Sequence, residues 1–244
     1  MRSSARVVVI GGGAVGAACL YHLAQAGISD CLLIEKDELT SGSTWHAAGN
    51  IPTYATSWLG MRAGNYAWRL YKDLAEQVDS AITYRHTGAF WPAHSSDRMD
   101  LFKHLVGISK SAGFELAMLS PAEMEAMHPW YRAGDSVIGG IYDPYEGDID
   151  PSQLTQALAR GARAGGAEVA RFTRVTGITR NADNEWLVAT DKGDIRCEII
   201  VNATGFYGDE IGNMLGQQLP VAVLEHQSLV TDTLDKLQLD SELF

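Results

Sequence analysis

The feature that most constrains the fold is a run of glycines between an apolar segment and a helix-like segment. Residues 6–10 read Arg-Val-Val-Val-Ile, a β-branched apolar run that favours a buried parallel strand. The glycine run, Gly-Gly-Gly-Ala-Val-Gly at 11–16, follows at once, and residues 14–26 have a small-residue helix pattern. A second apolar run at 31–34 ends in an acid, Glu35. This order predicts a βαβ unit with a glycine turn after its first strand.

Each glycine in such a turn has a separate role. The first allows the tight turn, the second lets the backbone approach a pyrophosphate, and the third lets the helix pack closely on the strand. The phosphates lie at the helix N-terminus, where free N–H groups and the helix dipole favour an anion. Glu35 stands roughly twenty residues beyond the glycines, the spacing of an acid that binds a ribose hydroxyl. The segment therefore predicts a dinucleotide site, and a strand–helix turn without a ligand is the disfavoured alternative.

Composition bounds the remaining functions. The chain has 244 residues, enough for one large core or two smaller ones, and a net charge of −11. Nucleic acid and anionic membranes are therefore not expected as main partners, because both require a basic patch. The cysteines have no metal-ligand spacing, which predicts no metal site and buried free thiols in a reducing compartment. They are Cys19, Cys31 and Cys197.

The start of the chain resembles a signal peptide only superficially. Arg2 and Arg6 precede an apolar run, but that run continues into the expected strand, glycine turn and helix without a cleavage-like break. No apolar run approaches the length of a membrane span. The sequence therefore predicts a cytoplasmic protein.

Beyond residue 60 the pattern alternates between helix and strand. Helices are expected at 66–78, 96–113 and 151–165, and a capping box at 120–123 opens a short one. Strands are expected at 81–90, 138–142, 168–173, 175–180, 186–190, 195–202 and 221–231. The strand ending at residue 202 runs into Ala-Thr-Gly-Phe-Tyr-Gly, which would offer backbone N–H groups at the carboxyl edge of a parallel sheet. Together with the glycine run, this turn is expected to approach the same ligand.

Four segments together carry a family resemblance. They are the glycine run with Glu35-Lys36, residues 38–49 (Glu-Leu-Thr-Ser-Gly-Ser-Thr-Trp-His-Ala-Ala-Gly), the Asp-Ile-Asp-Pro turn at 148–151, and Val-Asn-Ala-Thr-Gly-Phe at 201–206. In these residues the chain resembles the D-amino-acid-oxidase-like flavoproteins, and within them the dimethylglycine and sarcosine dehydrogenase branch. The resemblance implies an α/β fold. A discontinuous, Rossmann-like FAD-binding domain would span 1–85 and 149–220, interleaved with an incomplete α+β substrate-binding domain at 86–148 and 221–244.

The resemblance also implies FAD as the cofactor. Glu35 would hold the adenosine ribose, and residues 42–50 would wrap the ribityl chain and the flavin ring. His46 matches the histidine that this branch bonds to the flavin 8α-methyl carbon, which implies a covalent flavin; a lone histidine is otherwise more often a hydrogen-bonded structural residue. The implied cofactor-binding residues are Gly11, Gly13, Ala14, Val15, Gly16, Glu35, Lys36, Gly42, Ser43, Thr44, Trp45, His46, Ala47, Ala48, Gly49, Asn50, Val175, Gly205 and Tyr207.

The implied activity is oxidation of the C–N bond of a small N-methylated amine or amino acid, similar to dimethylglycine or sarcosine. Hydride transfer to flavin N5 would give an iminium, which water hydrolyses to formaldehyde and the demethylated amine. A group that keeps the amine deprotonated would speed this reaction. We expect His226, on the strand at 221–231, in that role, with a structural strand histidine as the equal alternative. Electrons would pass to an electron-transfer flavoprotein or to oxygen.

Several alternatives remain beside this prediction. Tyr54, Trp58 and Trp91 would form an aromatic wall around a methylated ammonium, or pack individually in a core. The acids between 143 and 150 suggest a metal loop, but their spacing and prolines fit a turn and a helix cap better. Relatives continue beyond the point where this chain stops, so we expect a truncated portion that binds FAD poorly or is inactive alone. A non-catalytic regulatory protein with the same fold is the rival, and an NAD-dependent dehydrogenase is disfavoured because it leaves the Ser-Thr-Trp-His loop unexplained.

Overall fold

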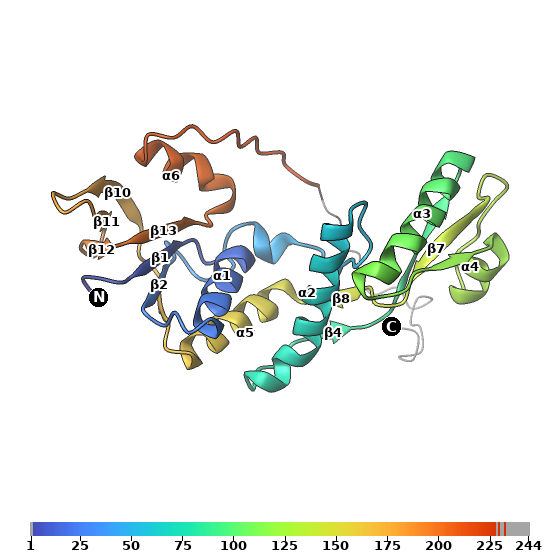
Figure 1. The fold of residues 1–244 in the computed structure, drawn as a ribbon, viewed down its shortest axis with the longest axis horizontal. Helices are drawn as coiled ribbons and strands as arrows, with labels where there is room; N and C mark the ends of the chain where they lie inside the picture. Colours follow the sequence, from blue (N-terminus) through green and yellow to red (C-terminus); the bar gives the residue numbers. More distant parts are fainter. Residues whose placement is uncertain (1, 228, 230–231, 233–244) are drawn as a thin grey trace. The chain divides into compact units, whose positions relative to one another are not determined.

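The structure is a computed structural model that describes residues 2–227, 229 and 232 (Figure 1). The chain divides into two compact units that alternate along the sequence. Unit 1 takes its described residues from 2–48, 74–82 and 150–232, and unit 2 from 49–73 and 83–149. The domain bounds expected from the sequence remain a prediction.

Unit 1 is built on a four-stranded parallel sheet with the order β13-β1-β2-β9. Its strands are β1 (Val7–Ile10), β2 (Cys31–Ile34), β9 (Glu168–Ala170) and β13 (Ile199–Asn202). Every residue of β1 and β2 is buried, as expected for parallel strands covered on both faces. The α/β prediction is therefore confirmed, with β1 and β2 at the predicted positions.

Two helices of unit 1 lie side by side next to this sheet (Figure 1). They are α1 (Ala14–Gln25) and α5 (Pro151–Ala164). Close packing requires a glycine on α5, because a Cβ at Gly161 would lie 2.7 Å from the Tyr21 ring. Asp150 caps α5 by accepting hydrogen bonds from Ser152 N–H and Gln153 N–H, each at 2.8 Å. The predicted helix cap is thus confirmed.

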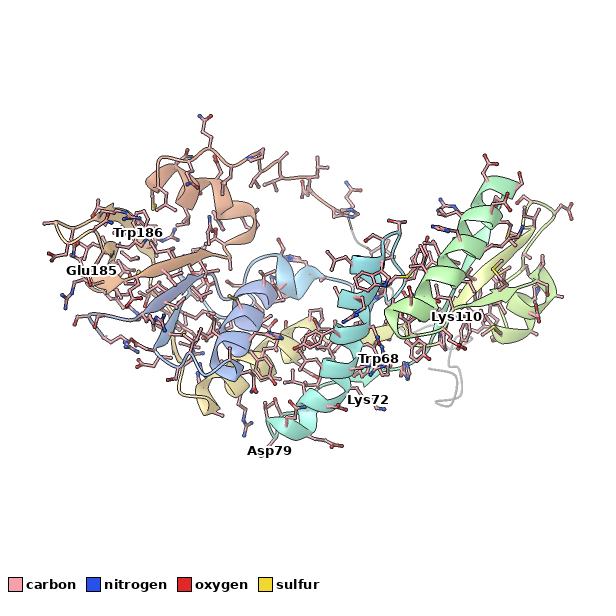
Figure 2. All side chains as sticks on the ribbon, in the orientation of Figure 1. Trp68, Lys72, Asp79, Lys110, Glu185 and Trp186 are labelled. Carbon is pink, nitrogen blue, oxygen red and sulfur yellow. The ribbon has the colours of Figure 1, made fainter. Side chains whose placement is uncertain are left out.

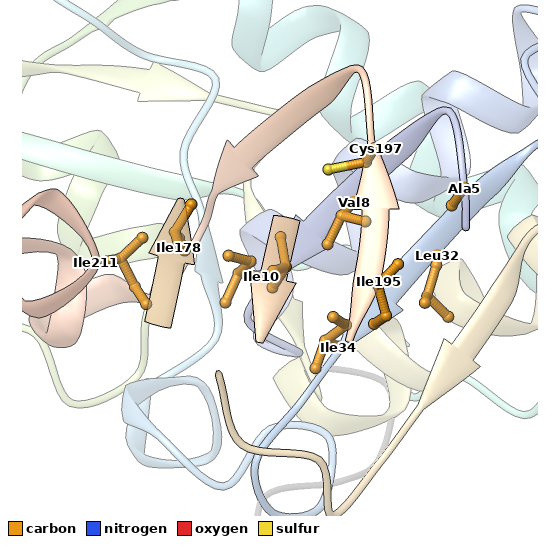
Figure 3. Packing of buried hydrophobic residues seen from close by; sticks show 10 residues of the cluster. Ala5, Val8, Ile10, Leu32, Ile34, Ile178, Ile195, Cys197 and Ile211 are labelled. Carbon is orange, nitrogen blue, oxygen red and sulfur yellow. The ribbon is translucent and has the colours of Figure 1, made fainter. Parts of the chain in front are cut away.

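A three-stranded antiparallel sheet packs on the parallel sheet within unit 1. Its strands are β10 (Val175–Arg180), β11 (Trp186–Thr190) and β12 (Ile195–Cys197). Trp186 begins β11, next to Glu185 (Figure 2), and the Arg180 guanidinium lies 4.1 Å from its ring centroid. Figure 3 shows the shared core, in which side chains of the two sheets meet. Its members include Val8, Ile10, Leu32, Ile34, Ile178, Val188, Ile195 and Ile211.

The prediction of a single strand at 195–202 is wrong, because the chain passes from one sheet to the other at Glu198. The residues before it form β12 in the antiparallel sheet, and those after it form β13 beside β1. At the change, both Glu198 N–H and Ile199 N–H donate to Arg6 O at 3.1 Å. An apolar run alone carries no signal for such a change of partner.

Unit 2 contains two three-stranded sheets. The first has the order β5-β7-β6 and the second β3-β8-β4. Their strands are β3 (Asn50–Ile51), β4 (Tyr84–Arg85), β5 (Ala89–Ala93), β6 (Ala117–Leu119), β7 (Gly139–Asp143) and β8 (Gly147–Ile149). The helices are α3 (Ser96–Ala112), α4 (Pro121–Met127) and residues 58–73 of α2 (Trp58–Gln77). Phe102, Leu105 and Ile141 lie at the centre of its core.

Three other expected elements differ from the structure. The helix expected at 66–78 begins earlier, at Trp58. The strand expected at 81–90 is instead β4 and β5, separated by a turn at Gly88, whose φ is +69°. The strand expected at 168–173 ends at Ala170, because Phe172 has a φ of +53° and leaves extended geometry.

The prediction of a strand at 221–231 is also wrong for those of its residues that the structure describes. Residues 221–227 are exposed and form no strand. A strand requires an edge with which to pair its backbone, and none of the described strands pairs with this segment. Positions 228, 230 and 231 lie outside the described residues.

The cysteines form no disulfide. Cys31 and Cys197 are buried, as predicted, whereas Cys19 is half-buried. Burial, with a contribution from Glu185, raises the pKa of Cys197 to about 11. In the described part of the chain, no helix combines the length and apolar character that a membrane span requires.

Candidate cofactor-binding site

A cavity of about 290 Å³ lies at the carboxyl end of the parallel sheet in unit 1. Three of its walls are the turns that follow β1, β2 and β13, and residues 41–44, residues 173–175 and α6 (Gly208–Met214) complete it. Ligands of parallel α/β sheets bind outside the carboxyl ends of the strands. The predicted dinucleotide segment therefore faces a real cavity, which we call the cleft.

The glycine turn of the cleft has no room for side chains. Gly11 has a φ of +111°, and a Cβ there would lie 2.4 Å from Ala203 O at the end of β13. A Cβ at Gly16 would lie 1.9 Å from Gly11 O. Both obstacles are backbone atoms, which cannot rotate aside as a side chain would. The turn thus brings β13, β1 and α1 together only when these positions are glycine.

The N-terminus of α1 opens into the cleft. Its N-cap is Gly13, which supplies no side-chain cap, and its first turn has no acidic residue. Ala14 N–H donates to Thr44 Oγ1 at 3.1 Å, and Val15 is 72% exposed. The first N–H groups of a helix have no partner within the helix, and they carry its positive end. This geometry suits an anionic group such as a pyrophosphate.

Glu35 is fixed in the wall of the cleft directly after β2. Its side chain is only 9% exposed, and its two carboxylate oxygens accept from Gly12 N–H at 2.7 Å and Asp37 N–H at 2.9 Å. Each oxygen keeps a further lone pair for a hydroxyl donor. The carboxylate therefore both ties the glycine turn to β2 and can receive ribose hydroxyls.

Replacing Glu35 with glutamine should destabilise the turn. The amide of the new side chain would place an N–H₂ group against one of the two backbone donors, so we expect Glu35→Gln to lower the free energy of unfolding by about 1–3 kcal/mol. Glu38→Gln is the control, because Glu38 pairs with Arg171 at the exposed surface, where such pairs contribute at most about 1 kcal/mol. Urea unfolding of both variants measures the difference. Equal stability of the two variants would contradict the role of Glu35.

Lys36 and Tyr207 meet at the cleft. Lys36 Nζ lies 3.4 Å from Tyr207 Oη and 4.4 Å from the centroid of its ring, and 3.1 Å from Asp37 Oδ2. Burial lowers the pKa of Lys36, but its hydrogen bonds to Asp37 and Tyr207 outweigh this, so the pKa lies above its ordinary value. Lys36 therefore remains a cation in the lining of the cleft, which Glu35 also lines.

Asn202 holds the turn that presents Tyr207. Its Nδ2 donates to Gly208 O at 3.0 Å, and its Oδ1 accepts from Thr204 Oγ1 at 2.7 Å. Gly205 has a φ of +61°, which favours glycine. The side chain of one asparagine thus closes the turn after β13.

His46 lies at the end of a short 3₁₀ helix, Ser43–His46. Its ring is exposed and lies 3.7 Å, centroid to centroid, from the ring of Trp45. His46 Nδ1 lies 3.3 Å from Gly42 O. Because a carbonyl oxygen only accepts hydrogen bonds, this contact assigns the proton to Nδ1 and leaves the lone pair on Nε2.

The structure brings many, but not all, of the predicted cofactor residues to the cleft. Those that line it are Gly11, Gly13, Ala14, Val15, Glu35, Lys36, Gly42, Ser43, Thr44, Val175, Gly205 and Tyr207. Gly16 supports the turn from behind, and Trp45, His46, Ala47 and Ala48 are exposed next to the lining residues in the chain. Gly49 and Asn50 belong to unit 2, where a Cβ at Gly49 would lie 2.1 Å from Ile149 O.

Sequence reasoning missed other residues of the lining. Gly12 and Asp37 are adjacent in sequence to predicted cofactor residues, so their position in the motif could have predicted that they line the cleft. Thr173 and Arg174 had none, since they reach the cleft only because Phe172 turns the chain out of β9. His226 is exposed and lies outside any described strand, so its expected strand setting is wrong. Among the described residues, no cluster of histidine, cysteine or acid side chains could hold a metal ion.

Comparison with known proteins now decides the family. Residues 6–243 match the family model described as FAD dependent oxidoreductase. The chain belongs to this family. Human mitochondrial dimethylglycine dehydrogenase is 37% identical over 97% of this chain, and human mitochondrial sarcosine dehydrogenase is 34% identical over the same share. This chain spans only 27% and 26% of those two relatives, about a quarter of their length.

Solved structures agree with the family assignment. The crystal structure of L-proline dehydrogenase from P. horikoshii matches with a TM-score of 0.80 and 28% identity, over 88% of this chain and 57% of that one. The predicted D-amino-acid-oxidase type of fold is thereby confirmed. The cleft fits the family's FAD, because its glycine turn leaves space where side chains would stand, the N-cap of α1 is a glycine without a side chain, and Glu35 offers a fixed acceptor.

Proposed function

We propose that this chain is the FAD-binding portion of an enzyme that oxidises the C–N bond of a small N-methylated amine, similar to dimethylglycine or sarcosine. The cleft carries the cofactor part of this proposal, since three independent features of it suit a dinucleotide. The names of the two human relatives support the substrate class. The electron acceptor would be an electron-transfer flavoprotein or oxygen.

The residues of the cleft divide the binding of FAD among them. Ala14 and Val15 would lie under the pyrophosphate at the start of α1, with Val15 N–H as a donor, since Ala14 N–H already donates to Thr44 Oγ1. Glu35 would accept from the adenosine ribose. Val175 would contact the adenine through its backbone, and Tyr207, held by Lys36, would close over the cofactor.

His46 would bind the flavin 8α-methyl carbon covalently through Nε2. That carbon would lose a proton, and the two electrons left on the flavin would pass to the electron acceptor named above. The hydrogen bond from Nδ1–H to Gly42 O supports Nε2 as the bonding atom, because it leaves the Nε2 lone pair available as a nucleophile. The exposed position of the ring also leaves it accessible. A covalent bond would prevent loss of the cofactor.

Bound FAD supplies the acceptor for the hydride that leaves the carbon next to the amine nitrogen. The protein must then hold the amine in its neutral form, since the nitrogen lone pair assists hydride loss. His226 remains our proposal for the group that takes the amine proton. The exposed ring of His226 could accept this proton only if the substrate reaches residues 221–227.

Anaerobic reduction tests the proposed function. The purified chain, loaded with FAD, should lose its yellow colour on addition of dimethylglycine or sarcosine and release formaldehyde. Trimethylglycine is the matched control, because its nitrogen carries the same methyl groups but no lone pair. Loss of colour with dimethylglycine or sarcosine, but not with trimethylglycine, supports the proposal. A chain that binds FAD but is reduced by neither N-methyl amine would contradict catalysis by this chain alone and would leave the non-catalytic regulatory protein and the inactive portion as the two alternatives.

A further inference from the structure

Unit 2 presents an aromatic surface that has no role in the cleft. Trp91 on β5 is 38% exposed, although it is a large apolar side chain. Its ring contacts that of Tyr54, with centroids 5.2 Å apart and planes at 38°. Trp91 Nε1–H donates to Glu146 Oε2 at 3.3 Å. A hydrogen bond to a carboxyl group adds electron density to the indole and so favours a cation on its face.

Two buried acids lie beneath this surface. Asp143 is fully buried and Glu146 is 5% exposed. Asp143 accepts hydrogen bonds from Thr53 Oγ1 at 2.5 Å, Tyr54 N–H at 2.9 Å and Tyr145 N–H at 3.0 Å, and these donors stabilise its negative charge. Burial and the charge of Asp143 raise the pKa of Glu146, while the Trp91 hydrogen bond opposes that rise. A buried carboxylate close to an exposed ring attracts a cation there more strongly than it would through bulk water.

No cation of the protein occupies this position in the described part of the chain. Neither acid forms an ion pair there, and no lysine or arginine lies over Trp91 or Tyr54. Other rings of unit 2 do carry a cation: Arg62 lies 5.1 Å from Trp58, and Arg69 lies 5.7 Å from Trp68, with Lys72 of the same helix also near Trp68 (Figure 2). The Trp91 surface therefore has an aromatic face with buried acids behind it, and no lysine or arginine among the described residues lies over that face.

We propose that the exposed face of Trp91, bordered by Tyr54 and backed by Asp143 and Glu146, binds the methylated ammonium group of the substrate as it arrives from solution, before the amine gives up the proton that hydride transfer requires it to lose. This assignment rests on the proposed function and names the part of unit 2 that recognises the substrate class. The acids do not reach the surface, so attraction acts through the indole face and not through a direct ion pair. A methylated ammonium is suited to such a face, whereas a primary ammonium must give up strong hydration without gaining acceptors.

Binding to the whole chain, with or without FAD, tests this proposal. The probe is tetramethylammonium chloride, and the readout is the set of indole N–H signals in a nitrogen–proton NMR spectrum. Trp91→Phe identifies the Trp91 signal and retains an aromatic face. We expect a saturable shift of that signal with tetramethylammonium and a much smaller one with ammonium chloride at the same ionic strength.

Variants separate the surface from general folding effects. Trp91→Leu should weaken binding about 3- to 30-fold, the range of one cation–π contact, as measured by equilibrium dialysis. Trp130→Leu is the matched control, since Trp130 is also an exposed tryptophan of unit 2, but its ring packs against His128 and not against Tyr54 or Trp91. Glu146→Gln retains an acceptor for the indole N–H and removes a charge, so it should weaken binding while leaving the Trp91 fluorescence environment in place.

Failure of this proposal can be distinguished from failure of the proposed function. If dimethylglycine fails to reduce FAD but Trp91 still binds tetramethylammonium, the proposed function fails and the cation surface stands. Absence of a saturable Trp91 shift, an equal response to ammonium, or equal binding by Trp91→Leu and the folded wild type would overturn the proposal. If Trp91→Leu does not fold, the Trp91→Phe and Glu146→Gln affinities decide the question.

Discussion

Gly16→Ala is expected to lower the free energy of unfolding by about 1–3 kcal/mol or more, and to abolish FAD binding. The added Cβ would lie 1.9 Å from Gly11 O, so either α1 must move away from the turn or the turn must open. Either movement displaces the N–H groups at the start of α1 from the position that suits a pyrophosphate. Urea unfolding measures the stability, and titration with FAD, followed by flavin fluorescence, measures the binding.

Gly107→Ala is the matched control for this variant. Gly107 also lies inside a helix, α3, but nothing lies within 4 Å of the position its Cβ would take. Alanine has the higher helix propensity, so this variant should be neutral or more stable by up to about 1 kcal/mol. It should bind FAD as the wild type does. Loss of FAD binding in both variants, or in neither, would show that the space around Gly16 does not control the site.

His46→Ala is expected to abolish covalent attachment of the flavin without preventing its binding. The substitution removes the only histidine of the segment 38–50, but it leaves the lining of the cleft unchanged. After acid precipitation, flavin should remain in the wild-type pellet and move to the supernatant in the variant. The intact mass of the wild type should exceed that of the polypeptide by one FAD, and the variant should show the polypeptide mass alone.

A second histidine variant checks that this change is specific. His104 is an exposed histidine on α3, so His104→Ala should keep its flavin in the pellet. If the wild type releases all of its flavin to the supernatant, His46 does not form the covalent bond. FAD would then be held in the cleft by non-covalent contacts alone.

The parts of the fold that the sequence predicted well depend on local physical chemistry. The glycine turn requires small residues wherever its backbone makes contact. Asp150 caps α5 by accepting from N–H groups only two and three residues further along the chain. Ser120 and Glu123 form both hydrogen bonds of the predicted capping box. Each of these signals is contained within a few residues, so a sequence pattern records it directly.

The parts that could not be predicted depend on contacts between distant residues. The change of sheet at Glu198 is decided by Arg6, which lies near the opposite end of the described chain. Thr173 and Arg174 enter the cleft through the backbone turn at Phe172, a residue type that gives no turn signal. Likewise, the pairing of Trp91 with Glu146 joins two segments whose residues, taken separately, predict a core aromatic and a loop acid. Local propensity carries no information about such partners.

The flavin content of the purified chain, expressed with FAD available, tests the central claim most directly. The account predicts one FAD per folded chain, summed over the acid pellet and its supernatant, with far less in Gly16→Ala than in Gly107→Ala. A wild-type chain that is folded by its cooperative unfolding transition, yet contains no flavin and takes up none in a titration, would contradict the assignment of the cleft to FAD.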